Sequence, residues 1–197
     1  MMYSRGLIDS SMSYGQYRDL IDALLMEGKT TGNNQSAAMT NYTEMNVQRM
    51  KRLDKTTSIT DTALEKINAL NKNYTWLVLT EAWCGDAAQT IPVMNKIAEA
   101  SNGKISVRFI LRDQHLYIMD AHLTNNGRAI PKLIVLNNNL KELADWGPRP
   151  KLLQDMVNDW KADPLLTHED WIEKVHAWYA KDRTAQTMLE LLDLLKT

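Results

Sequence analysis

The sequence predicts an α/β protein with a mixed sheet of about four strands and helices on both faces. Two observations support this fold class. Short apolar runs alternate with amphipathic segments along the middle of the chain, in the order helix, strand, helix, strand, helix, strand, strand, helix. The last two strand segments are joined only by Asn137-Asn138-Asn139, so they are antiparallel, whereas the earlier strand–helix–strand unit is a parallel, right-handed crossover.

Helices are expected where apolar residues recur at helical spacing. Ser13 is placed to cap the first helix, and Gly28 lies where a C-terminal glycine belongs. Thr167-His168-Glu169-Asp170 resembles a capping segment that opens one long helix, or two. The predicted helices cover residues 13–27, 36–55, 61–70, 87–100, 114–123 and 151–161, and the last segment up to residue 195.

Strands are expected where apolar runs lack the helical period. Tyr74 to Thr80 fits a strand that is buried on both faces, and Ile105 to Leu111 alternates as a strand does. The final pair, residues 132–136 and 140–146, forms a hairpin, because asparagine in the connecting turn tolerates positive φ.

Composition limits the classes of function. The chain has 197 residues, 44% hydrophobic and 24% charged, with a formal net charge of −1. These values are typical of a globular protein, and the neutral balance argues against nucleic acid or an anionic membrane as partner. The sequence has no signal-peptide core near its start and no apolar run of bilayer length, so we expect a cytoplasmic protein.

Cys84, the only cysteine, lies between a predicted strand and a predicted helix. A helix N-terminus lowers the pKa of a thiol through its unpaired N–H groups and its dipole. Asp86 acts in the opposite direction, because it repels a thiolate. Arg112, Arg128 and Lys132 are cations expected at the same rim, and the sequence leaves open which effect prevails.

Residues 61–161 resemble the thioredoxin superfamily. Trp83-Cys84-Gly85-Asp86 stands where that superfamily has Trp-Cys-Gly-Pro-Cys, and Pro92 matches the proline that kinks its active-site helix. Ile130-Pro131 matches the cis-proline that faces the cysteine. The chain is more closely similar to small bacterial thioredoxin-like proteins of largely unassigned function, through the segments 31–36, 81–86, 111–113, 127–132 and 146–150.

The resemblance implies a thioredoxin fold in which Cys84 is the catalytic residue. Trp83, Gly85, Asp86 and Pro131 would support it. The domain then has three parts: a helical extension at residues 1–60, the core at 61–161 and a second helical extension at 162–197. We expect the extensions to pack together on one side of the sheet or to mediate a homodimer.

Two classes of function stay open at this point, because Ala87 stands where a resolving cysteine would be. One is a monothiol thiol-disulfide oxidoreductase that forms a mixed disulfide with a protein or a low-molecular-weight thiol, with Ile130 and Arg128 contacting the substrate. The alternative is a non-catalytic module that binds proteins or peptides, since free cysteine is often a small buried hydrophobe. A third option is an iron–sulfur carrier assembled across a dimer.

Other kinds of site have little support. The histidines are not completed into a metal site by a cysteine or carboxylate cluster; they are His115, His122, His168 and His176. The sequence contains neither a glycine-rich phosphate loop nor a Gly-x-Ser-x-Gly motif. We therefore predict no metal and no cofactor.

Overall fold

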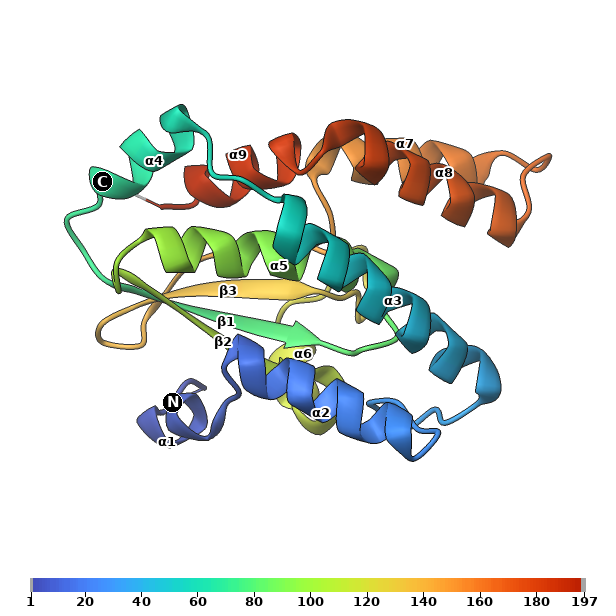
Figure 1. Cartoon of the computed structure of the whole chain (residues 1–197), viewed down its shortest axis with the longest axis horizontal. Coiled ribbons are helices and arrows are strands. Elements are labelled where there is room, and N and C mark those ends of the chain that lie inside the picture. Colours follow the sequence, from blue (N-terminus) through green and yellow to red (C-terminus); the bar gives the residue numbers. More distant parts are fainter. Residues whose placement is uncertain (1, 196–197) are drawn as a thin grey trace.

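The computed structural model describes residues 2–195, which form a four-stranded mixed sheet with helices on both faces (Figure 1). The strand order is β2-β1-β3-β4; β1 is parallel to β2 and antiparallel to β3, and β3 is antiparallel to β4. The predicted fold class is therefore confirmed. The strands are β1 (Tyr74–Thr80), β2 (Ile105–Leu111), β3 (Lys132–Asn137) and β4 (Glu142–Trp146).

Most helices begin and end close to their predicted bounds. The side chains of Ser13 and Thr167 form capping boxes with Gln16 and Asp170, which confirms both predicted helix starts. The helices are α1 (Arg5–Ser10), α2 (Tyr14–Met26), α3 (Ala37–Thr56), α4 (Asp61–Asn68), α5 (Gly85–Ala100), the 3-10 turn η1 (Arg112–Gln114), α6 (Leu116–Met119), α7 (Lys151–Ala162), α8 (His168–Asp182) and α9 (Ala185–Asp193).

The predicted helix bounds are wrong where the local backbone conformation departs from what the apolar periodicity indicates. Helix α1 was not predicted. The helix expected at 114–123 is only η1 and the short α6, because His115 has non-helical φ and ψ of −129° and 44°. The C-terminal segment is two helices, since Arg183 and Thr184 both have positive φ, which ends α8 and starts α9.

The β3–β4 turn also differs from its prediction. Strand β4 begins at Glu142, and Leu140, not an asparagine, has positive φ (56°). Asn137 contributes a side-chain acceptor instead, because its Oδ1 accepts the backbone N–H groups of Asn139 and Lys141. The asparagine run thus predicts the turn correctly for the wrong physical reason.

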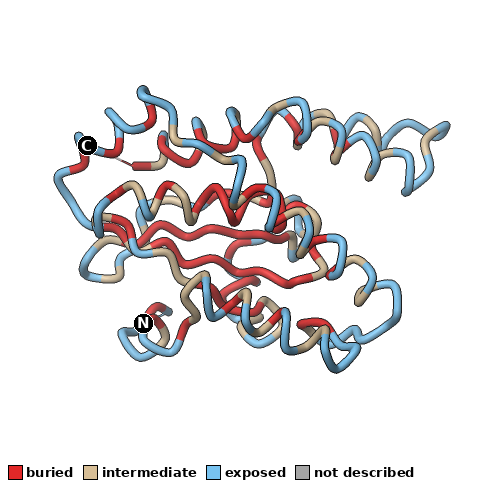
Figure 2. The backbone as a smooth tube through the Cα atoms, in the orientation of Figure 1, coloured by how far each residue is buried: buried red, intermediate tan, exposed pale blue. Residues whose placement is uncertain are grey.

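The core lies on both faces of the sheet, as the red strands and the red inner side of α5 show in Figure 2. Helices α3, α4, α5 and α9 lie on one face, and α2 and α6 lie on the other (Figure 1). On the α2 side, Tyr17 stacks on Phe109 of β2 with ring centroids 5.5 Å apart. The added helices are therefore divided between the faces rather than packed together on one side, because both apolar faces of β1 must be covered.

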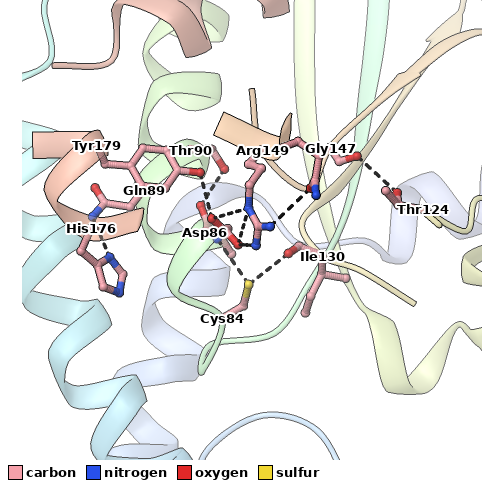
Figure 3. Close-up of polar contacts among 12 residues, drawn as sticks. Cys84, Asp86, Gln89, Thr90, Thr124, Ile130, Gly147, Arg149, His176 and Tyr179 are labelled. Carbon is pink, nitrogen blue, oxygen red and sulfur yellow. Dashed lines mark hydrogen bonds and ion pairs between the residues drawn. The ribbon is translucent and has the colours of Figure 1, made fainter. Parts of the chain in front are cut away.

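Helices α7 and α8 pack against each other around a small separate core. Its buried residues are Leu153, Val157, Val175 and Tyr179. This pair brings α8 to the N-terminal end of α5 (Figure 3). None of the helices within residues 2–195 has an apolar stretch of the length that a bilayer crossing requires.

Candidate functional site

The thiol of Cys84 lies at the end of the turn that connects β1 to α5, as the N-cap residue of that helix. Its Sγ–H donates to the carbonyl oxygen of Ile130 at 3.1 Å, and its Sγ accepts the backbone N–H of Ala87 at 3.5 Å (Figure 3). This second contact starts α5 at Gly85, two residues earlier than periodicity predicts. Both hydrogen-bonding roles of the thiol are thus taken within the chain.

The segment opposite Cys84 contains Ile130 and Pro131, in the position that the resemblance implies. The Ile130–Pro131 peptide bond is cis, and both residues are buried. Gly147, after β4, packs directly on this segment: a Cβ at Gly147 would lie 2.2 Å from the carbonyl oxygen of Pro131, and its φ is 120°. Only glycine fits this close approach of two backbones.

Burial decides the protonation state of the thiol. Cys84 is 8% exposed, and desolvation raises its pKa to about 12, with repulsion from Asp86 adding to the rise. The N–H groups of Ala87 and Asp86 and the charge of Arg149 act to lower the pKa and are outweighed. The effect of the helix start is present, but it is smaller than that of burial.

Asp86 is held by an ion pair that connects three parts of the fold. Arg149, which follows β4, donates Nε to both carboxylate oxygens at 3.2 Å and also donates Nη2 to Oδ2. The hydroxyl of Tyr179 on α8 donates to Oδ1 at 3.0 Å (Figure 3). Burial and the carboxylate raise the pKa of Tyr179 well above its ordinary value, so this hydroxyl stays a donor.

The cations expected near the thiol each pair with another carboxylate. The pairs are Arg112–Asp113, Arg128–Asp120 and Lys132–Asp145, with N–O distances of 2.8, 2.6 and 3.0 Å. Arg112 also lies 4.9 Å above the ring of Trp83. Sequence reasoning missed Arg149, although β4 runs antiparallel to β3 and so returns the chain to the rim where β1 ends. That topology was the available signal.

His176 on α8 lies against the start of α5. Its Cε1 would be 3.0 Å from a Cβ at Gly85, and its Nδ1 is 3.5 Å from the amide nitrogen of Gln89 (Figure 3). Burial, with repulsion from Arg49, lowers the pKa of His176 to about 4, against a smaller opposing effect of Asp86. The imidazole is therefore neutral at neutral pH.

The remaining histidines contact other side chains or backbone, and His168 also lines a cavity beside Cys84. His122 contacts Tyr3 and Glu142 through its Nε2, and His168 meets the ring of Trp171 edge-on at 4.8 Å. His115 contacts the carbonyl of Leu111. Across residues 2–195, no group of three or more His, Cys, Asp or Glu side chains is arranged to hold a metal ion.

A cavity of about 270 Å³ opens beside Cys84, between the cysteine turn, α3 and α8. Its walls include Tyr42 and Arg49 of α3, Trp83 of the turn, and Trp171 and His176 of α8. The helical extensions thus build two of its sides, which motif reasoning about the core alone does not reveal. A larger cavity of about 380 Å³ lies near α1, α2 and β2 and contains none of the residues of the thiol site.

Comparison with known proteins supports the same fold. A family model described as thioredoxin matches residues 32–161, which places α3 inside the matched region and α8 and α9 outside it. A protein of unknown function from Pseudomonas aeruginosa aligns with a TM-score of 0.58 and 17% identity, over 93% of this chain and 96% of that one. An HIV epitope scaffold aligns at 0.56 and 16%, over 93% and 97%. No curated protein matches the sequence.

Proposed function

The chain belongs to the thioredoxin family, and we propose that within this family it is a non-catalytic binding module. One observation carries the proposal: the thiol of Cys84 is buried and internally hydrogen-bonded, while an open cavity lies beside it. Ala87 supports the same view, because a dithiol enzyme resolves its mixed disulfide with a second thiol. In this reading, the turn around Cys84 is a structural wall of a binding site.

The protonation of the thiol supports this proposal. Burial raises the pKa of Cys84 to about 12, so the thiol is almost entirely protonated at pH 7 and only a very small fraction carries the thiolate. The nucleophile in disulfide exchange is the thiolate, so such a fraction leaves little attacking species. The sulfur would also have to give up its hydrogen bond to Ile130 before it could approach a substrate.

A second candidate is a monothiol oxidoreductase, and the observation in its favour is that Cys84 borders the cavity. The Cys84 thiolate would attack a disulfide RS–SR′, form a mixed disulfide with RS and release R′S⁻. An external thiol would then attack this mixed disulfide, take RS into a new disulfide and restore Cys84. In this alternative Ile130 and Arg128 contact the partner, and Trp83 borders the entering group.

The proposed setting is the bacterial cytoplasm, based on the resemblance to small bacterial proteins with a Trp-Cys-Gly-Asp motif. The net charge of −1 favours a peptide, protein or small-molecule partner over nucleic acid or a membrane surface. Homodimer formation stays part of the proposal, with light scattering as its test.

Thiol reactivity separates the two candidates cleanly, because Cys84 is the only cysteine and every label reports on it. We would measure iodoacetamide labelling by intact mass from pH 6 to 10, for native protein and for protein unfolded in urea, with Cys84→Ser as the blank. A binding module gives native labelling at pH 7 at least 100-fold slower than the unfolded rate and no turnover of glutathione mixed disulfides. Rapid native labelling with a midpoint at or below about 8.5, together with turnover, would establish the monothiol enzyme instead.

A further inference from the structure

We propose that the cavity beside Cys84 binds a small monocarboxylic acid with an apolar body, and that the guanidinium of Arg49 holds the carboxylate. This inference rests on the binding function proposed above and names its ligand. The ligand is inferred from Arg49, whose guanidinium is held in place by a hydrogen bond and has no acidic partner within residues 2–195.

Arg49 is a half-buried residue of α3 that borders the cavity. Its Nη1 donates to Oδ1 of Asn46 at 2.7 Å, and the fully buried Asn46 donates its amide to the carbonyl of Ala82 at 2.8 Å. The guanidinium is therefore fixed relative to the cysteine turn. Within residues 2–195 it forms no ion pair with an acidic side chain, so most of its five donors are left for a ligand.

The other charged or basic side chains of the cavity lining are Asp86, Arg149, His168 and His176, of which His168 is 63% exposed to solvent. Asp86 and Arg149 neutralise each other in their ion pair, and His176 is neutral at neutral pH. Burial and the charge of Arg52 both lower the pKa of Arg49, so a bound anion would relieve an unfavourable state. A carboxylate fits best, because a guanidinium and a carboxylate form two parallel hydrogen bonds.

The cavity also limits the charge and size of the ligand. Because Asp86 and Arg149 form an ion pair without net charge, Arg49 offers one positive charge, which a monocarboxylate matches and a dianion such as a phosphate monoester exceeds. Tyr42, Trp83, Trp171 and Ile172 supply an aromatic and aliphatic lining. The volume of about 270 Å³ is below the roughly 300–1,000 Å³ of sites for drug-sized ligands, so the apolar body is small.

The test uses two matched probes, 3-phenylpropionate and its amide, titrated into the full chain at pH 7 and followed by calorimetry or NMR. We expect the acid to bind at least tenfold more tightly than the amide. Arg49→Gln should remove this preference, and Arg49→Lys should keep part of it, because lysine keeps the charge without the fork. Lys51→Gln is the matched control, because it also removes one positive charge from an exposed residue of the same helix, outside the cavity lining.

Three outcomes overturn the inference: equal affinity for acid and amide, no saturable binding of either probe at 10 mM, or an undiminished preference in Arg49→Gln. If Arg49→Gln does not fold, Arg49→Lys provides the test. A ratio of acid to amide affinity in Arg49→Lys equal to that of the wild type would contradict the proposed pair of parallel hydrogen bonds from the guanidinium. Failure of the ligand assignment is distinct from failure of the binding function. Slow labelling of Cys84 together with equal affinity for acid and amide would reject only the ligand assignment. Fast labelling of Cys84 together with turnover of glutathione mixed disulfides would reject the binding module itself.

Discussion

His176 makes the stability of this protein depend on pH between the two pKa values of its imidazole. The ordinary pKa of 6.5 applies to the unfolded chain, and burial lowers it to about 4 in the folded protein. Between these values the unfolded chain binds a proton that the folded protein does not, so the free energy of unfolding falls as the pH falls. At 1.36 kcal/mol per pKa unit, the imidazole contributes a loss of about 2.5 kcal/mol by pH 4.5.

The perturbation is His176→Gln, which removes the titrating group and keeps a polar side chain beside Gln89. Urea unfolding, followed by tryptophan fluorescence, would give the free energy of unfolding at pH 7 and pH 4.5. Carboxylates titrate in both proteins, so the informative quantity is the difference between their losses, which we expect to be about 2 to 3 kcal/mol. His168→Gln is the control, because that imidazole is 63% exposed on the same helix. Equal losses in wild type and His176→Gln would refute the reasoning.

Two further substitutions test the contacts that hold the cysteine turn. Asp86→Asn leaves Arg149 buried without its counter-charge and should cost about 3–5 kcal/mol of stability in urea unfolding. It should also raise the labelling rate of Cys84, because repulsion of the thiolate is lost; an unchanged rate contradicts this. Gly147→Ala puts a Cβ 2.2 Å from a carbonyl oxygen and should prevent folding, as measured by circular dichroism. Gly103→Ala is its control, with positive φ and nothing within 4 Å, and should cost only about 1 kcal/mol.

The sheet was predictable from sequence because its signal is local. Strand β1 reads as one apolar run, and it is buried along nearly its whole length. Helix α1 escaped prediction because six residues with one buried side chain, Ile8, give no periodic stripe. The incorrect prediction of one continuous helix through His115 has a similar origin. The imidazole of His115 hydrogen-bonds to the carbonyl of Leu111, and the backbone of His115 lies outside the helical region. Short elements are set by single contacts, which an apolar pattern does not report.

The residues of the candidate site also differ in whether the sequence could identify them. Cys84, Asp86 and Pro131 lie in contiguous motifs, so a resemblance in sequence was enough to bring them together. Their partners Arg149 and Tyr179 come from segments 63 and 93 residues beyond Asp86, and only the tertiary fold shows that they meet there.

The protonation of Cys84 shows why the chemistry of such a site cannot be fully predicted from its sequence motif. Sequence gives the signs of two opposing effects: the helix start favours the thiolate, and Asp86 opposes it. The largest effect, desolvation, is a sum over every element packed around the sulfur. The carbonyl of Ile130 and the start of α5 enclose the thiol, and α8 lies on that helix start through His176 and Tyr179. Because burial is the larger cause, unfolding the chain should lower the pKa of the thiol more than removing the charge of Asp86 does in the folded protein.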